Sequence, residues 1–156
     1  MSTVKIEGLA ELQRKLQELP GRIGTNVARR AVYAAAAIIR DDAIQRAPYW
    51  HGPVSEGHPP PGTLKKAIYV KYIREQSNAN QVVYFVGVRH GKSQQHVGKN
   101  DVSYDAYYWR WVEFQQGHSP NSVAYMRPAF DAKQNAAVQV MKDTLASGIS
   151  DEVAKL

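Results

Sequence analysis

The sequence has no cysteine among its 156 residues, and it has no long hydrophobic run. Without cysteine there is no disulfide scaffold, no thiolate zinc or iron–sulfur site and no cysteine nucleophile. No apolar stretch approaches the roughly 20 residues that a membrane-spanning helix needs. The first residues, Met1-Ser2-Thr3-Val4-Lys5, lack the apolar segment of a secretory signal. We therefore expect a protein without membrane contact that is cytosolic or released without secretion.

Motifs of catalysis and nucleotide binding are also missing. Gly91-Lys92-Ser93 follows a predicted strand, but a phosphate-binding loop needs a glycine five positions before Gly91, where the sequence has Val86. There is no G-x-S-x-G nucleophile motif. The histidines show no metal-binding spacing; they are His51, His58, His90, His96 and His118. We expect no enzyme activity, no cofactor and no metal site.

Charge is unevenly spread along the chain. The net charge is +6, and residues 51–100 carry 7 basic and 2 acidic side chains. Residues 101–156 carry 5 basic and 7 acidic side chains. Such a distribution indicates complementary surfaces on different copies of the chain, contact with nucleic acid, or simply a solvated basic surface.

Two helices are predicted in the first third of the chain. A short N-terminal helix is indicated by leucines at helical spacing, namely Leu9, Leu12, Leu16 and Leu19. A longer helix is predicted over residues 24–46, with Thr25 or Asn26 as its N-cap. Its centre, residues 31–39, is rich in alanine, whose small side chain lets another element approach closely. This helix either crosses its own sheet or packs against another subunit.

Strands and a final helix follow. Residues 68–74 and 81–88 are rich in β-branched and aromatic side chains and predict an antiparallel hairpin. The aromatic segment 105–114 fits a strand or a helix. If it is a strand, Trp109 and Trp111 lie on one face, and if it is a helix they lie on different faces. A last helix is predicted over residues 128–146, with Pro128 in its first turn and Gly148 ending it.

These elements predict an α+β fold in one domain, residues 1–156. The expected sheet has about three to four antiparallel strands and is packed by two long helices and the short N-terminal helix. Two long loops, residues 48–62 and 90–104, are expected to be poorly ordered in the free protein and ordered in an assembly. A short polar tail is expected from about residue 148.

Four sequence segments, taken in order, resemble a known family. They are Gly8-Leu9-x-x-Leu12 to Leu19-Pro20; the alanine-rich helix ending in Ala43-x-x-x-Ala47-Pro48; Gly62-Thr63-Leu64 before a basic-aliphatic strand; and Tyr108-x-x-x-Val112-Glu113-Phe114 followed by Met126-Arg127-Pro128-Ala129-Phe130. Together they resemble the tail-component family of long-tailed bacteriophages and prophages, whose members are tail-completion or head–tail joining proteins. The sequence departs from the family pattern in having Gln115-Gln116-Gly117 where members usually carry Gly-Thr.

The resemblance implies a structural virion protein without enzyme activity. Such proteins form a ring at the head-proximal end of the tail, so the implied partners are further copies of this chain in a hexamer, the tail tube protein and the head-connector or stopper proteins. The implied location is the neck or tail of the virion, with assembly in the host cytoplasm. Contact between the ring lumen and phage DNA stays open.

Six residues are candidates for the subunit or neck-partner interface. They are Tyr49, Trp50, Trp109, Trp111, Glu113 and Arg127. The tryptophans are candidates because aromatic residues dominate interface hot spots, although Trp109 and Trp111 also suit a core. Glu113 and Arg127 lie in segments that are otherwise apolar, where a charge needs a partner. They pair with each other within the chain, or across a subunit boundary.

A small basic nucleic-acid-binding protein is the alternative function. Aromatic residues on the predicted hairpin, Tyr69, Tyr84 and Phe85, could stack on bases beside Lys71. Arg74 and Arg89 could then hold phosphates. No recognisable nucleic-acid-binding motif accompanies them.

Overall fold

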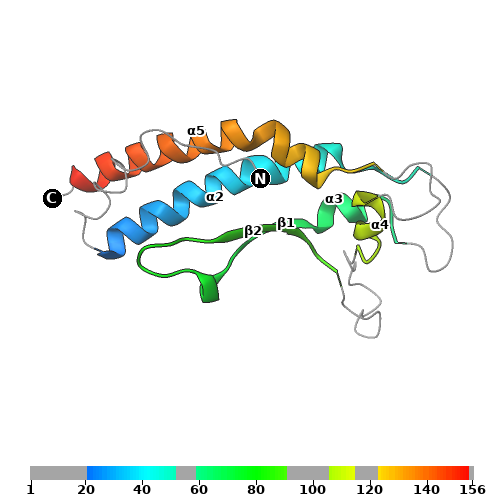
Figure 1. The fold of residues 1–156 in the computed structure, drawn as a ribbon, viewed down its shortest axis with the longest axis horizontal. Helices are drawn as coiled ribbons and strands as arrows, with labels where there is room; N and C mark the ends of the chain where they lie inside the picture. Colours follow the sequence, from blue (N-terminus) through cyan, green and yellow to red (C-terminus); the bar gives the residue numbers. More distant parts are fainter. Residues whose placement is uncertain (1–20, 52–58, 91–105, 115–122, 155–156) are drawn as a thin grey trace.

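The computed structural model describes residues 21–51, 59–90, 106–114 and 123–154. Its elements are helix α2 (Gly21–Arg46), helix α3 (Thr63–Ala67), strand β1 (Ile68–Tyr72), the 3-10 turn η1 (Arg74–Gln76), strand β2 (Tyr84–Val88), helix α4 (Trp109–Glu113) and helix α5 (Met126–Val153). The predicted α+β fold is confirmed (Figure 1). The described residues form a two-stranded sheet, so the prediction of three to four strands is too high for this part of the chain. The predicted N-terminal helix, residues 52–58 of the first predicted loop and residues 91–104 of the second lie outside the described residues.

Helix α2 is the middle layer of the molecule. It packs along α5 on one side and against both strands on the other, as the order of the layers in Figure 1 shows. Its buried positions are mostly alanines, with Ala31, Ala36 and Ala43 all buried. Small side chains permit close approach from two sides at once, which explains the alanine-rich sequence. The helix therefore does cross its own sheet.

Both long helices extend beyond their predicted ends. Helix α2 begins at Gly21, so Thr25 lies inside it, where its hydroxyl donates to the Gly21 carbonyl at 2.7 Å, and neither Thr25 nor Asn26 is the N-cap. Helix α5 continues past Gly148 to Val153. Gly148 does not end the helix but is buried against Val27 of α2, so its lack of a side chain serves helix packing.

The hairpin has the predicted antiparallel pairing. Its register places Ile68 opposite Val88, Val70 opposite Val86 and Tyr72 opposite Tyr84. Ile68 and Val88 are buried, and α2 lies against both strands. Alternation along a strand then places Tyr69, Lys71 and Phe85 on the opposite face. Among the described residues, helices thus cover one face of the sheet only.

The turn before β1 requires a glycine. Gly62 has a φ of +82°, a left-handed conformation that glycine adopts without strain. The ring of Tyr49 also lies close to this position, with Cε2 3.1 Å from where a Cβ would stand. Next, the buried Thr63 hydroxyl donates to the Pro60 carbonyl at 2.6 Å. These contacts fix α3 as a single helical turn before β1.

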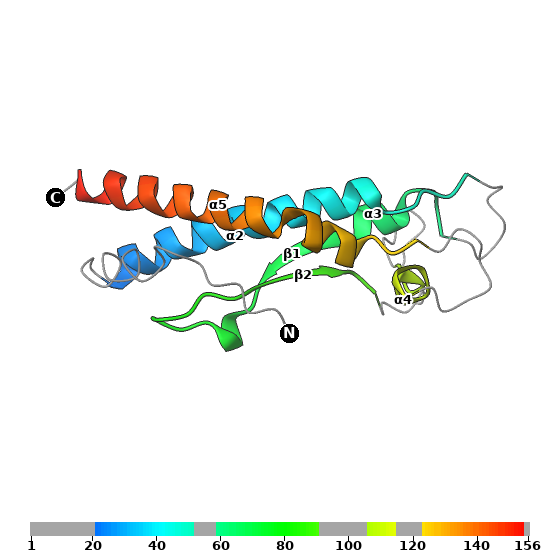
Figure 2. The ribbon, with the colours of Figure 1, turned by 45° about the horizontal axis from the view of Figure 1, so that its top comes forward.

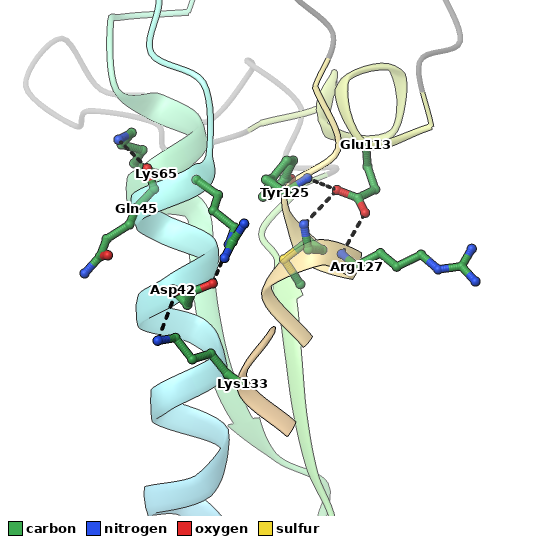
Figure 3. A network of polar contacts seen from close by, with 9 residues as sticks. Asp42, Gln45, Lys65, Glu113, Tyr125, Arg127 and Lys133 are labelled. Carbon is green, nitrogen blue, oxygen red and sulfur yellow. Dashed lines mark hydrogen bonds and ion pairs between the residues drawn. The ribbon is translucent and has the colours of Figure 1, made fainter. Parts of the chain in front are cut away.

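A buried carboxylate joins the two long helices. Asp42 of α2 accepts a hydrogen bond from Arg46 Nε one turn later, and its other oxygen lies 3.6 Å from Lys133 Nζ on α5 (Figure 3). The hydrogen bond from Arg46 has the largest influence on the pKa of Asp42 and outweighs burial, which acts in the opposite direction. The pKa of Asp42 is therefore lowered from its ordinary value. The carboxylate is therefore charged throughout the neutral range.

This carboxylate gives the fold a specific sensitivity to acid. A depressed native pKa contributes stability above the ordinary aspartate value of about 3.9, and that stability is lost as the pH falls through the lower native value. We expect the wild-type melting temperature to fall more steeply below about pH 4 than that of the Asp42→Asn variant. The matched control is Asp41→Asn, which changes an exposed neighbour. Parallel melting curves against pH for wild type and Asp42→Asn would contradict the expectation.

No helix in the described part of the chain is long and apolar enough to span a membrane.

Candidate subunit interface

The short helix α4 is held against the end of the hairpin. Ala106, fully buried, donates its N–H to the carbonyl of Arg89 just after β2, and its own carbonyl accepts from Trp109 N–H at 3.0 Å. Trp109 packs against the core formed by the end of α2, α3, the strands and the start of α5. Its ring lies beside His90, with centroids 5.6 Å apart. This side of α4 is thus fixed on the rest of the fold.

Glu113 fastens the other end of α4 to helix α5. Its side chain is nearly buried, and its carboxylate accepts three backbone hydrogen bonds: from Tyr125 and Met126 to Oε2, both at 2.8 Å, and from Arg127 to Oε1 at 2.9 Å (Figure 3). A negative charge at a helix N-terminus is favourable because the first N–H groups point toward it. Glu113 is therefore the N-terminal cap of α5, supplied from a distant part of the sequence.

The cap accounts for every donor in the first turn of α5. The first four N–H groups of a helix lack a partner within it. Here three of the four positions, Tyr125 to Arg127, donate to Glu113, and the fourth is Pro128, which has no N–H. The first helical bond then runs from Ala129 N–H to the Tyr125 carbonyl at 3.2 Å. The Met-Arg-Pro-Ala-Phe sequence and the distant glutamate form one structural unit.

This arrangement corrects the expected pairing of Glu113 with the Arg127 side chain. Glu113 contacts the main chain of Arg127, and the guanidinium points away from it into solvent (Figure 3). Tyr125 is fully buried beside the cap. Burial, followed by the nearby Glu113 carboxylate, raises the pKa of its phenol, so Tyr125 stays neutral. The charge of Glu113 is satisfied within the chain.

The outer side of α4 carries an exposed aromatic patch, which we define as Tyr107, Trp111 and Phe114. Their side chains are 51%, 54% and 60% exposed. The Tyr107 and Trp111 rings meet edge to face with centroids 6.0 Å apart, and Phe114 lies against Trp109 at 6.3 Å. Because α4 is a helix, Trp109 and Trp111 fall on different faces, one toward the core and one toward solvent. We call these three residues the α4 patch.

All six interface candidates lie at one end of the molecule. Trp109, Trp111 and Glu113 are in α4, and Arg127 is in the first turn of α5. Tyr49 and Trp50 follow the end of α2 and are exposed, with the Tyr49 ring 5.0 Å from that of His51. The core cluster that includes Ala47, Leu64 and Tyr125 unites these segments. Tyr107 and Phe114 were not among the interface candidates predicted from the sequence, because their exposure depends on α4 being a helix.

An open apolar groove is a second feature that the sequence did not reveal. It has a volume of about 390 Å³ and is lined by Val32, Ala36 and Ile39 of α2, Val86 of β2 and Phe130 of α5, among others. Alanines in the middle of α2 leave this space beside the larger side chains of the strand. The alanine-rich segment of α2 was the sequence feature that could have indicated this groove. Helix packing explains such a segment equally well.

The hairpin separates the residues proposed for base stacking. Tyr69 and Phe85 share the uncovered face, whereas Tyr84 alternates to the helix-covered face, where its ring lies 5.3 Å from Tyr72 and 5.8 Å from Tyr33. The proposed stacking surface therefore loses Tyr84. Among the described residues no group of three or more histidine, aspartate or glutamate side chains is placed to hold a metal.

A helix-backed hairpin with an aromatic patch on a fixed support has the features of a protein that acts by binding other proteins. Comparison with protein families identifies which kind. Residues 10–114 match the family described as "Bacteriophage HK97-gp10, putative tail-component". The match spans more than half of the chain, so the chain belongs to this family, as its motifs predicted, and is a structural component of the bacteriophage tail. Searches of curated proteins and of solved structures gave no match.

Proposed function

We propose that this protein forms a hexameric ring at the head-proximal end of the tail and joins the tail tube to the head connector. Its role in this proposal is structural, without catalysis. Family membership supports a place in the tail, and sixfold symmetry follows from the resemblance, because tail tubes of this class are built from hexamers. A ring lies between two unlike partners, so it needs one surface for its own copies and others for the tube and the connector.

The α4 patch is the observation that carries the joining role. Tyr and Trp anchors near the centre of a contact supply most of the binding energy in protein interfaces, whereas surface charge pairs contribute only about 0–1 kcal/mol each. Three large aromatic side chains on a fixed helix and its two flanks are costly to leave in water. The patch is therefore the proposed docking surface for an adjoining ring of the neck.

Trp111→Ala tests this role. Trp111 is more than half exposed, so its loss is expected to change the free energy of unfolding by less than about 1 kcal/mol. Loss of an interface anchor is expected to reduce the yield of infectious particles at least about a hundredfold in a phage that depends on the variant. Electron micrographs should then show separate heads and tails.

The matched control is Tyr33→Ala, which removes an exposed aromatic side chain from the middle layer. It is expected to leave particle yield unchanged. Wild-type particle yield from Trp111→Ala would show that the α4 patch does not join the tail to its neighbours. A wild-type protein whose sedimentation mass stays at 17.4 kDa, even with tail tubes present, would contradict the ring.

A further inference from the structure

The layer order leaves two broad outer faces. Helix α2 is covered by α5 on one side and by the hairpin on the other, and Figures 1 and 2 show this order from two directions. In the part of the chain that the structure describes, the outer faces are therefore the face of the β1–β2 hairpin turned away from α2 and the solvent side of α5. A two-stranded sheet is marginal by itself, and sheets in stable folds are usually packed by another element.

The outer face of the hairpin is apolar at its centre and basic at its rim. Phe85 is 51% exposed, and its ring lies edge to face with Tyr69 at a centroid distance of 6.4 Å. The Phe85 ring also covers Gly87, where any Cβ would stand 2.0 Å from it. Lys71 lies directly across the ladder from Phe85, and the Arg89 guanidinium lies 6.0 Å from the Tyr69 ring centroid. We call these residues the hairpin face.

The solvent side of α5 has the opposite charge. After Arg127 in the first turn, the charged residues of α5 that are exposed are all aspartates, namely Asp131, Asp143 and Asp151. The lysines of this helix are less exposed, and Lys133 lies beside Asp42. Between the aspartates the exposed side chains are mainly small, such as Ala132, Ala136 and Ala146. This acidic side of α5 is elongated and presents few bulky side chains.

We propose that the hairpin face of one copy docks on the acidic side of α5 in the next copy. Basic residues at the hairpin rim meet the aspartates, while Phe85 and Tyr69 lie over the small side chains between them. Because the two faces are unlike and on opposite sides of the chain, the contact is head-to-tail, and its repetition closes a ring where the rotation permits. The inference rests on the proposed ring and assigns its contact between subunits.

Charge complementarity favours a second copy of the chain over nucleic acid as the occupant. DNA would satisfy the basic rim but would leave the acidic side of α5 unpartnered, whereas a second copy satisfies both faces with the same contact. Complementary charges steer partners and fix register, and like charges placed opposite each other oppose association. The contact is therefore open to a test by charge reversal.

Two reversed variants test the contact. Variant A carries Lys71→Glu and Arg89→Glu, and variant B carries Asp143→Lys and Asp151→Lys. Each alone places like charges across the contact and is expected to weaken association about a hundredfold, leaving a monomer in sedimentation velocity. An equal mixture of A and B places opposite charges at every contact, so the ring mass is expected to return, with A and B alternating. Circular dichroism melting checks that each variant is folded.

The single reversal Lys71→Glu has Arg30→Glu as its matched control, because Arg30 is also an exposed basic residue but lies on the middle layer. Arg30→Glu is expected to leave the ring intact. Rings that persist in A and B alone would overturn this contact but not the proposed ring, whereas a monomeric wild type would overturn both. Ring assembly unaffected in A, together with DNA binding that is lost in A, would overturn the contact and assign the hairpin face to nucleic acid.

Discussion

Replacing Glu113 with alanine is expected to lower the free energy of unfolding by at least about 3 kcal/mol, because it leaves three backbone donors at the start of α5 without their acceptor. A buried donor without a partner costs about 1–3 kcal/mol, and a typical N-cap with one bond contributes about 1 kcal/mol. The loss also separates α4 from α5, so the α4 patch loses its fixed position. Urea unfolding at neutral pH, followed by circular dichroism, measures the change.

The control for this prediction is Arg127→Ala. The Arg127 side chain takes no part in the cap and is exposed, so its removal is expected to change stability by less than about 0.5 kcal/mol. Glu113→Gln keeps the shape and one acceptor oxygen but removes the charge, and it is expected to fall between wild type and alanine. Equal losses from Glu113→Ala and Arg127→Ala would indicate a side-chain ion pair and contradict the cap.

Glu113 also shows which part of the candidate site could be predicted from the sequence. A lone acidic residue among aromatics predicted that the charge has a partner, and the proximity of Glu113 to residue 127 was correct. The predicted partner of Glu113 was wrong: it is the backbone rather than the Arg127 side chain. Every residue except proline has a backbone N–H group, so the sequence does not indicate which of them will bind a carboxylate. A glutamate that caps a helix locally stands within one turn of it, so the usual capping pattern could not indicate a cap from a separate element.

The hairpin and the long helices were predictable because their signals are local. β-Branched and aromatic residues predicted the antiparallel pair from 68 to 88, and alanine content predicted that another element approaches α2 closely. The choice of helix for α4 was not predictable, because a five-residue segment is too short for helical and strand periodicities to differ clearly. That choice decides which tryptophan is exposed, so the α4 patch could be recognised only in three dimensions.

Gly148 gave a misleading local signal. Glycine near the end of an amphipathic segment often marks a helix end, yet α5 continues for another five residues to Val153. Glycine is tolerated inside this helix because α2 passes close by: a Cβ built on Gly148 would stand 2.7 Å from Val27 Cγ1. The cost of glycine in a helix interior, about 1 kcal/mol relative to alanine, is offset by the close contact between the two helices.

This contact predicts a large loss of stability in Gly148→Val. Valine adds a Cβ and two methyl groups where Val27 already stands, and a β-branched side chain in a helix has little rotamer freedom to move aside. We expect the free energy of unfolding to fall by about 3 kcal/mol, at the upper end of the range for overpacked cores. Gly148→Ala should lose less, since its gain of about 1 kcal/mol in helix propensity opposes the clash.

Two further variants separate packing from helix propensity. Ala146→Val introduces the same side chain two residues earlier on the exposed side of α5 and should cost only about 0.5 kcal/mol. Val27→Ala removes the opposing methyl groups, so combining it with Gly148→Ala should cost less than the sum of the two single changes, with a coupling of about 1 kcal/mol. If α5 ended at Gly148, the chain there would lie outside the helix–helix contact. Gly148→Val would then resemble Ala146→Val, and Val27→Ala would show no coupling.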